Sequence, residues 1–298
     1  MTTSIRQGSV VVGVDGSSGG DTALGWAVRY ASARRKPLTI LSGAGDPLLY
    51  TMASSPIDVH EGLRAGAHRI TDHALTIARK LAPDLDIEVT TPVRDARNAL
   101  LESSNDASIV VVGTRGRGPV RSLLLGSVSA AVAEHAACTV AVVRPTDLNV
   151  DVDVDEKSHI VVGTDGGPAS TAALEFGFEL ASVEHRDIDI VECWSVQDTI
   201  MDTVGSSRGP AQVSEHERMI SASLAGCTDK YPDVPVTRHV PDRGVVEAIV
   251  DMSTDASTVV IGARGRSGPR VLMGSVSRIV AERAHSTVVV VRACAAGW

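Results

Sequence analysis

Two segments of the sequence combine glycine, arginine and serine in an order that suits a polyphosphate. Residues 110–129 read VVVGTRGRGPVRSLLLGSVS, and residues 259–277 read VVIGARGRSGPRVLMGSVS. In each, an apolar run leads into a Gly-x-x-Gly turn, an arginine-bearing loop and a Gly-Ser helix start. Glycines let backbone N–H groups approach an anion, and a helix start adds N–H groups and a positive dipole end. The two segments therefore predict two phosphate cradles.

In each cradle, glycines form the turn, arginines supply positive charge and serines supply hydroxyl donors. The first cradle comprises Gly113, Thr114, Arg115, Gly116, Arg117, Gly126, Ser127, Val128 and Ser129, and the second comprises Gly262, Ala263, Arg264, Gly265, Arg266, Gly274, Ser275, Val276 and Ser277. A Gly-x-x-Gly turn by itself is common in loops that bind nothing, so the prediction depends on the whole arrangement recurring. No G-x-x-x-x-G-K-[ST] sequence occurs, which excludes a P-loop.

The second cradle has the shorter loop. Nine residues separate Gly116 from Gly126, whereas eight separate Gly265 from Gly274, and Pro269 stiffens the shorter loop. Because loop length sets where the helix start lies relative to the turn, we expect a different phosphate geometry in the second copy. We therefore expect the first half to bind its ligand more tightly.

An aspartate ends the first apolar run of each half. Asp15 lies in V-G-V-D-G-S and Asp165 lies in V-G-T-D-G-G. Such a carboxylate would accept hydrogen bonds from ribose hydroxyls or from adenine. Alternatively, it holds its own turn, because Asp bonds backbone N–H groups just ahead of it. The sequence leaves both roles open, and the position beside a predicted crevice favours the ligand role.

The cradles belong to a duplication that covers most of the chain. Residues 10–17 match 160–167, and residues 134–144 match 282–292. We expect one domain over 1–145, a second over 159–298, and a linker over 146–158 that is rich in acidic residues.

Each half alternates apolar runs with helical patterns. Strands are expected near 9–14, 38–42, 86–90, 108–112 and 139–143, and near 159–163, 188–193, 234–239, 257–261 and 287–291. Helices of the first half are expected near 19–35, 61–82, 95–104 and 127–136, with long loops over 43–60 and 195–212. This alternation predicts parallel sheets with helices on both faces and a ligand crevice where the winding direction reverses.

Composition narrows the class of protein. Of 298 residues, 43% are hydrophobic and 3% aromatic, so the cores are built from aliphatic side chains. The net charge of −8 argues against nucleic acid or an anionic membrane as the partner. The N-terminal segment lacks the apolar region of a signal peptide, and no run has the length of a membrane span. We expect a soluble, cytoplasmic protein.

Cysteines and histidines offer no stronger site. Cys138, Cys193, Cys227 and Cys294 form no C-x-x-C pair and have no zinc-site spacing, so we interpret them as reduced thiols and expect no metal site. His60, His68 and His73 are interpreted as surface or packing residues. No Ser/His/Asp or Cys/His arrangement predicts a nucleophile, and no catalytic residue is proposed.

The combined motif resembles that of the universal stress protein family. G-x-x-G, nine residues and G-S, following an initial V-G-V-D-G-S, are similar to its tandem-domain form, which is common in actinobacteria. The resemblance implies two tandem α/β domains of Rossmann-like (adenine nucleotide alpha-hydrolase-like) fold. Each would have a five-stranded parallel sheet of order 3-2-1-4-5. It also implies ATP as ligand, with or without Mg²⁺, bound by members that keep the complete motif.

Further site residues follow from the resemblance. In the first half they are Gly13, Asp15 on the ribose or adenine side, and Gly43, whose backbone would contact adenine. Their counterparts are Gly163, Asp165 and Cys193. The cradle glycines would approach the ribose and phosphates, and the Gly-Ser helix starts would contact the phosphates.

Three functions are compatible with these residues. The first is an ATP-binding regulator of stress or growth that switches shape or partners with nucleotide occupancy. The second is a slow ATPase or phosphotransfer enzyme, and the third is a dimerisation scaffold that uses no nucleotide. The apolar last strands, 139–143 and 287–291, resemble those through which family domains pair, so a homodimer is expected. The sequence names no protein partner.

Overall fold

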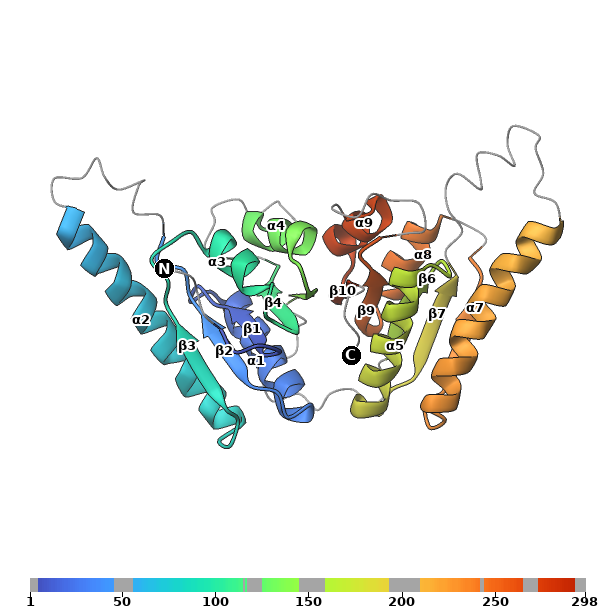
Figure 1. Cartoon of the computed structure of the whole chain (residues 1–298), viewed down its shortest axis with the longest axis horizontal. Coiled ribbons are helices and arrows are strands. Elements are labelled where there is room, and N and C mark those ends of the chain that lie inside the picture. The colour runs from blue at the N-terminus through green and yellow to red at the C-terminus, as the bar shows by residue number, and fades with distance from the viewer. Residues whose placement is uncertain are drawn as a thin grey trace. The chain divides into compact units, whose positions relative to one another are not determined.

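The chain forms two compact units, Met1–Asp147 and Leu148–Trp298. The computed structural model describes residues 5–45, 56–114, 116, 125–144, 159–192, 210–241, 244–264 and 273–292, without the side chains of 56–60 and 210–217. The division between the units falls inside the predicted linker, which itself lies outside the described residues. Figure 1 labels the elements of both units.

The first unit is a five-stranded parallel sheet with four described helices. Its elements are β1 (Val10–Gly13), α1 (Ser18–Ala33), β2 (Leu38–Leu41), α2 (Pro56–Leu81), β3 (Ile87–Thr90), α3 (Ala96–Ser103), β4 (Ile109–Gly113), α4 (Ser127–His135) and β5 (Thr139–Val143). The strands pair in the order β3-β2-β1-β4-β5. This confirms the predicted 3-2-1-4-5 order.

The second unit repeats this order with its own strands. Its elements are β6 (His159–Thr164), α5 (Pro168–Glu184), β7 (Ile188–Glu192), α7 (Pro210–Lys230), β8 (Val236–His239), α8 (Val245–Met252), β9 (Ala256–Gly262), α9 (Ser275–Arg283) and β10 (Thr287–Val291). Its strands pair in the order β8-β7-β6-β9-β10, again all parallel. The two units therefore share one topology.

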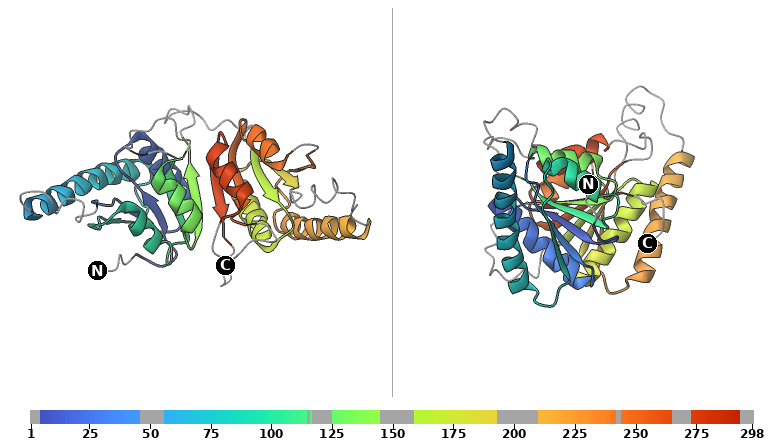
Figure 2. Two further views of the ribbon diagram at one scale, coloured as in Figure 1. Left: turned by 90° about the horizontal axis from the view of Figure 1, so that it is seen from above. Right: turned by 60° about the vertical axis from the view of Figure 1, so that its left-hand side comes forward.

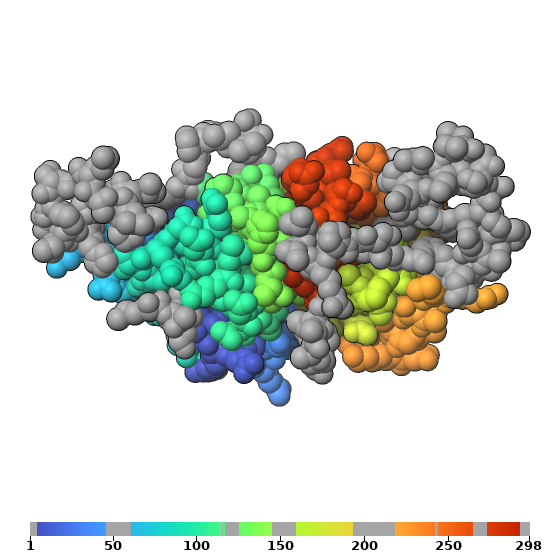
Figure 3. Space-filling view, turned by 45° about the horizontal axis from the view of Figure 1, so that its top comes forward, coloured from blue at the N-terminus to red at the C-terminus, as the bar shows by residue number. Residues whose placement is uncertain are grey.

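Helices cover both faces of the sheet in the first unit. Right-handed crossovers place α1 and α2 on one face and, after the winding reverses at β4, α3 and α4 on the other (Figure 2). The surfaces of α3 and α4 adjoin, in teal and green (Figure 3). Because both faces are covered, all five residues of β4 and of β5 are buried, which explains their continuous aliphatic sequences.

Two helices begin earlier than the sequence pattern predicts. The expected loop 43–60 overlaps α2, which starts at Pro56, and the expected loop 195–212 overlaps α7, which starts at Pro210. Proline is favoured at the first helical position, because its fixed φ suits a helix and its missing N–H would have no partner there. The prolines thus mark helix starts that apolar periodicity alone does not reveal.

The described residues contain neither a membrane-spanning helix nor a cluster of metal ligands. No helix there has the length and hydropathy needed to cross a membrane. No group of three or more His, Cys, Asp or Glu side chains in the same ranges is placed to hold a metal ion. Cys138 and Cys227 are buried and are not joined in a disulfide, and Cys193 and Cys294 lie outside the described residues.

Candidate functional site

The structure brings the first aspartate and the first cradle together. Strands β1 and β4 are neighbours, with Val12 opposite Val111, so their carboxyl ends meet at one edge of the sheet. Gly116, just past β4, lies so close to Asp15 that a Cβ there would overlap the Oδ2 atom of the carboxylate. Two motifs far apart in the sequence therefore lie together, at the switch point where α/β folds bind ligands.

Each aspartate also holds the turn that leads into the next helix. Asp15 Oδ1 accepts hydrogen bonds from the Ser17 hydroxyl and from the Ser17 backbone N–H, the latter at 3.0 Å. Ser17 in turn caps α1 by accepting from the N–H of Gly20 at 3.2 Å. The local role left open by the sequence is therefore present, and it fixes the carboxylate at the crevice.

The second aspartate uses different partners for the same purpose. Asp165 Oδ1 accepts from the Gly167 N–H at 2.9 Å and from the Ser170 hydroxyl at 2.7 Å. Gly167 takes the place of a side-chain cap at α5, which begins with Pro168. Each turn contains a glycine of positive φ, 75° at Gly16 and 71° at Gly166.

Three hydrogen bonds fix the base of the first cradle. The Thr114 N–H donates to the Val143 carbonyl at 3.0 Å, and the Gly126 N–H donates to the Thr114 carbonyl at 2.7 Å. The hydroxyl of Ser129 donates to the carbonyl of Gly113. The loop between β4 and α4 is therefore closed at its base, and the start of α4 is fixed to the end of β4.

The second cradle has the same three bonds in spite of its shorter loop. Ala263 donates to Val291 at 2.7 Å, Gly274 donates to Ala263 at 2.8 Å, and the Ser277 hydroxyl donates to Gly262 at 2.7 Å. The capping glycines have nearly identical backbone angles, φ −71° and ψ 158° at Gly126 and φ −67° and ψ 155° at Gly274. The expectation that the shorter loop displaces the helix start is wrong, because the hydrogen bonds and backbone angles that fix the helix start are the same in the two units.

The serines of the helix starts divide into two roles. Ser129 and Ser277 are buried, and each hydroxyl spends its one hydrogen on a carbonyl. In this structure both hydroxyls are therefore engaged within the protein, and their contact with a phosphate stays a prediction. Ser127 and Ser275 are exposed at the first helical position, followed by the half-buried Val128 and Val276.

The starts of α4 and α9 carry no side-chain cap. Gly126 and Gly274 have no side chain that could accept from the first turn. The first N–H groups of a helix have no intrahelical partner, and they lie at the positive end of its dipole. Each helix start thus presents N–H donors at the crevice edge.

Several predicted ligand glycines have a packing reason of their own. A Cβ on Gly113 would lie 2.5 Å from the Gly19 carbonyl oxygen, and one on Gly262 would lie 2.8 Å from the carbonyl carbon of Ala169. These glycines therefore allow α1 and α5 to approach the sheet closely. A requirement for glycine at these positions does not by itself indicate a ligand.

The glycine that ends β1 and the glycine two residues after β2 also have close neighbours. A Cβ on Gly13 would lie 3.0 Å from Leu100 Cδ1, and one on Gly43 would lie 2.6 Å from the Cα atom of Ala96. Gly163, the counterpart of Gly13, lies within β6. The counterpart of Gly43 is Cys193, which lies outside the described residues.

Of the predicted cradle arginines, Arg264 is the one within the described residues. Arg264 is half-buried, and its Nε atom is buried with no hydrogen-bond partner among the described residues. An anion at the second cradle would satisfy this guanidinium. Outside the described residues lie the predicted Arg115, Arg117, Gly265 and Arg266.

One feature of the second crevice was not predicted. Glu192 ends β7 with its side chain 3% exposed, and its Oε1 accepts from Arg238 of β8 through Nε at 2.9 Å and through Nη2. The strand register aligns this pair with Ser42 and Val89 of the first unit. The signal in the sequence was a charged residue that ends an apolar strand where the repeat has a serine.

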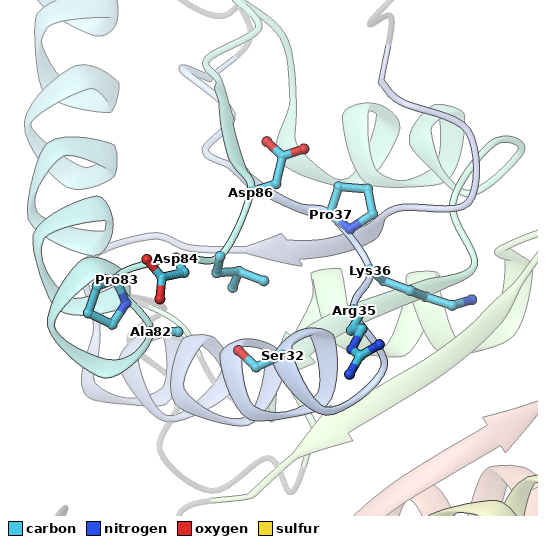
Figure 4. A pocket seen from close by; sticks show the side chains of 9 residues that line it. Ser32, Arg35, Lys36, Pro37, Ala82, Pro83, Asp84 and Asp86 are labelled. Atoms are coloured by element: carbon cyan, nitrogen blue, oxygen red, sulfur yellow. The ribbon is translucent and has the colours of Figure 1, made fainter.

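A hollow of about 440 Å³ lies at the other end of the first unit's strands from Asp15 and Gly116. Figure 4 shows its lining, which includes Ser32, Arg35, Lys36, Asp84 and Asp86. These residues precede β2 and β3, so the hollow lies at the amino ends of the strands and includes none of the predicted site residues. Ligands of open α/β sheets bind at the carboxyl ends, which favours the crevice at Asp15 and Gly116.

Known proteins share both the sequence and the fold. The model of the universal stress protein family matches residues 8–144 and 157–292. A universal stress protein of Mycobacterium tuberculosis H37Rv is 33% identical over 98% of this chain and 99% of its own. A second from that strain is 32% identical over 95% of this chain and 96% of its own.

A solved structure agrees with this assignment at the level of the fold. A universal stress protein from Archaeoglobus fulgidus DSM 4304 superposes with a TM-score of 0.70 at 17% identity, over 97% of this chain and 99% of that one. The sequence matches to the family span both units, and both units have the same strand order. The chain therefore belongs to the universal stress protein family and carries two of its domains in tandem.

Proposed function

We propose that the chain is an ATP-binding regulator of stress or growth whose crevices hold the nucleotide at the carboxyl ends of β1 and β4 and of β6 and β9. The observation that carries this proposal is the approach of Gly116 to the Asp15 carboxylate. It supports a role for Asp15 as the acceptor for ribose hydroxyls, because the carboxylate lies beside a loop and helix start that suit phosphates. Nucleotide occupancy would then set the shape or the partners of the protein.

The phosphate end of the site fits a polyanion. The uncapped starts of α4 and α9 supply N–H donors, and Ser127 and Ser275 add exposed hydroxyls. The partnerless Nε of Arg264 adds a charged donor in the second cradle. Mg²⁺, where present, would arrive on the phosphates.

The ribose end fits a sugar with hydroxyl donors. Ser17 fixes the Asp15 carboxylate before any ligand arrives, so little ordering cost remains when a ribose hydroxyl donates to it. Ser170 does the same for Asp165. We therefore propose sites in both units.

The first site is proposed to be the tighter one, on a basis other than loop length. Gly16, directly after Asp15, is exposed, whereas its counterpart Gly166 is buried. A ligand therefore reaches the turn of the first unit more easily than that of the second. We further propose that the chain forms a homodimer, which light scattering on the full chain would test.

Calorimetry with ATP tests the proposed function. Each of the variants Asp15→Asn and Asp165→Asn removes the acceptor charge while keeping the shape of the side chain. We expect Asp15→Asn to weaken ATP binding more, because the first site is proposed to be the tighter one. Asp72→Asn, at an exposed position of α2, is the matched control and should bind as the unaltered chain does. A chain that binds no nucleotide, in calorimetry or by mass analysis after purification, would instead be the nucleotide-free scaffold.

A further inference from the structure

A second hollow, of about 290 Å³, adjoins the turn that follows Asp15. It is lined by Gly16 and, from α2, by Gly66, Arg69, Ile70 and His73. The α2 residues have spacings of three and four, so they form one face of the helix. That face lies toward Gly16. The hollow therefore lies between the carboxyl end of β1 and the middle of α2.

The sheet order determines which part of a nucleotide would reach this hollow. The phosphate cradle follows β4, Asp15 follows β1, and α2 packs on β2 and β3, which continue the same order. A nucleotide with its phosphates at the cradle and its ribose at Asp15 would extend its base away from β4. That direction leads toward the side of the sheet covered by α2.

We propose that Arg69 and His73 contact the base of the nucleotide, an assignment that rests on the proposed function. Guanidinium and imidazole groups are planar and stack on base faces, and their N–H groups donate to the ring nitrogens of a purine. Ile70 adds an apolar contact between them. Gly66 leaves room for the ring, because a Cβ there would have no neighbour within 4 Å.

The second unit lacks part of this subsite. The last turns of α2 and α7 align through matching bonds, Ala82 N–H to Ala78 and Tyr231 N–H to Cys227. In this register Arg218 corresponds to Arg69, whereas Ala222 corresponds to His73. The base subsite is therefore complete only in the first unit, which gives a reason for unequal affinity that does not depend on loop length.

Calorimetry on the full chain with two probes, ATP and inorganic tripolyphosphate, separates the base from the phosphates. A stacked base contributes about 1–3 kcal/mol, so we expect the double variant Arg69→Met with His73→Ala to weaken ATP binding by about tenfold or more. Binding of tripolyphosphate should stay unchanged. Arg64→Met removes the same charge from an exposed position of α2 outside the hollow, and it should change neither affinity.

The other outcomes each overturn a defined part of the proposal. An equal loss for ATP and tripolyphosphate would assign Arg69 to the phosphates, and an unchanged ATP affinity would show that the hollow holds no base. If the unaltered chain binds both probes equally, the base subsite fails while the cradle stands. If the unaltered chain binds neither, the proposed nucleotide function fails together with the subsite.

Discussion

The hydroxyl of Ser129 donates to the carbonyl of Gly113 and so joins the first turn of α4 to the last residue of β4. Ser277 and Gly262 form the same bond in the second unit. These bonds fix the N–H groups of each helix start relative to the strand end. Ser129 and Ser277 therefore position the backbone donors of the helix starts.

Removing these hydroxyls should cost stability in both units alike. Ser129→Ala leaves a buried carbonyl without its donor, and we expect a loss of about 1–2 kcal/mol in the free energy of unfolding, measured with urea. Ser277→Ala should lose a similar amount. Ser127→Ala alters an exposed hydroxyl and serves as the control. A loss from Ser127→Ala as large as that from Ser129→Ala would contradict the division of roles.

Gly113 should tolerate no side chain. The Cβ of Gly113→Ala would lie 2.5 Å from the Gly19 carbonyl oxygen, so α1 must move away from β4. We expect a destabilisation of about 1–3 kcal/mol by urea unfolding, as for other overpacked sites. Gly62→Ala is the control, because its Cβ meets nothing within 4 Å and helical alanine is favoured by roughly 0.5–1 kcal/mol. A stabilised Gly113→Ala protein would refute the packing role.

Removing Arg238 from its ion pair with Glu192 should destabilise the chain more than removing both partners. Arg238→Val leaves a buried carboxylate without its partner and should destabilise the chain by about 1–3 kcal/mol, below the value for fully buried pairs because Arg238 is half-exposed. Glu192→Ser with Arg238→Val recreates the residues of the first unit and should be more stable than Arg238→Val alone. A double-mutant cycle by urea unfolding measures the coupling, and strict additivity would argue against it.

The free energy of unfolding should fall at high pH because of the buried thiol of Cys227. Burial raises its pKa above the ordinary value of 9.0, and the charge of Glu175 adds to this shift. Stability from the neutral thiol is complete below pH 9.0 and is lost as the pH rises toward the folded pKa, because only the unfolded thiol ionises readily. Cys227→Ala should remove this alkaline decline.

Mass spectrometry of alkylated peptides tests the same thiol directly. Iodoacetamide should label Cys227 far more slowly in the native chain than after unfolding in urea, since the thiolate is the reactive species. Rapid native labelling would show that the thiol is neither buried nor neutral.

The sequence predicted the fold well because its main determinants are local. Continuous aliphatic runs such as β4 and glycine turns at their ends are visible without tertiary information, and they located the strands. The strand order was implied by the resemblance to the family, and the pairing of β1 with β4 agrees with it. The consequence of loop length was misjudged, because the bond between Thr114 and Gly126 that fixes the anchors is invisible in the sequence. The hollow at Arg69 required knowing that α2 lies beside the β1 turn.

The closed bases of the two cradles have a consequence for how this chain can diverge. Each loop is a ring pinned at Thr114 and Gly126 or at Ala263 and Gly274. Lengthening a ring of about this size by one residue costs roughly 0.1 kcal/mol of closure entropy. Insertions within the loop should therefore change the free energy of unfolding very little. A change at the hydrogen-bonded ends of the loop disturbs both a strand and a helix. The two ends of each loop are therefore more constrained in sequence than the length of chain between them.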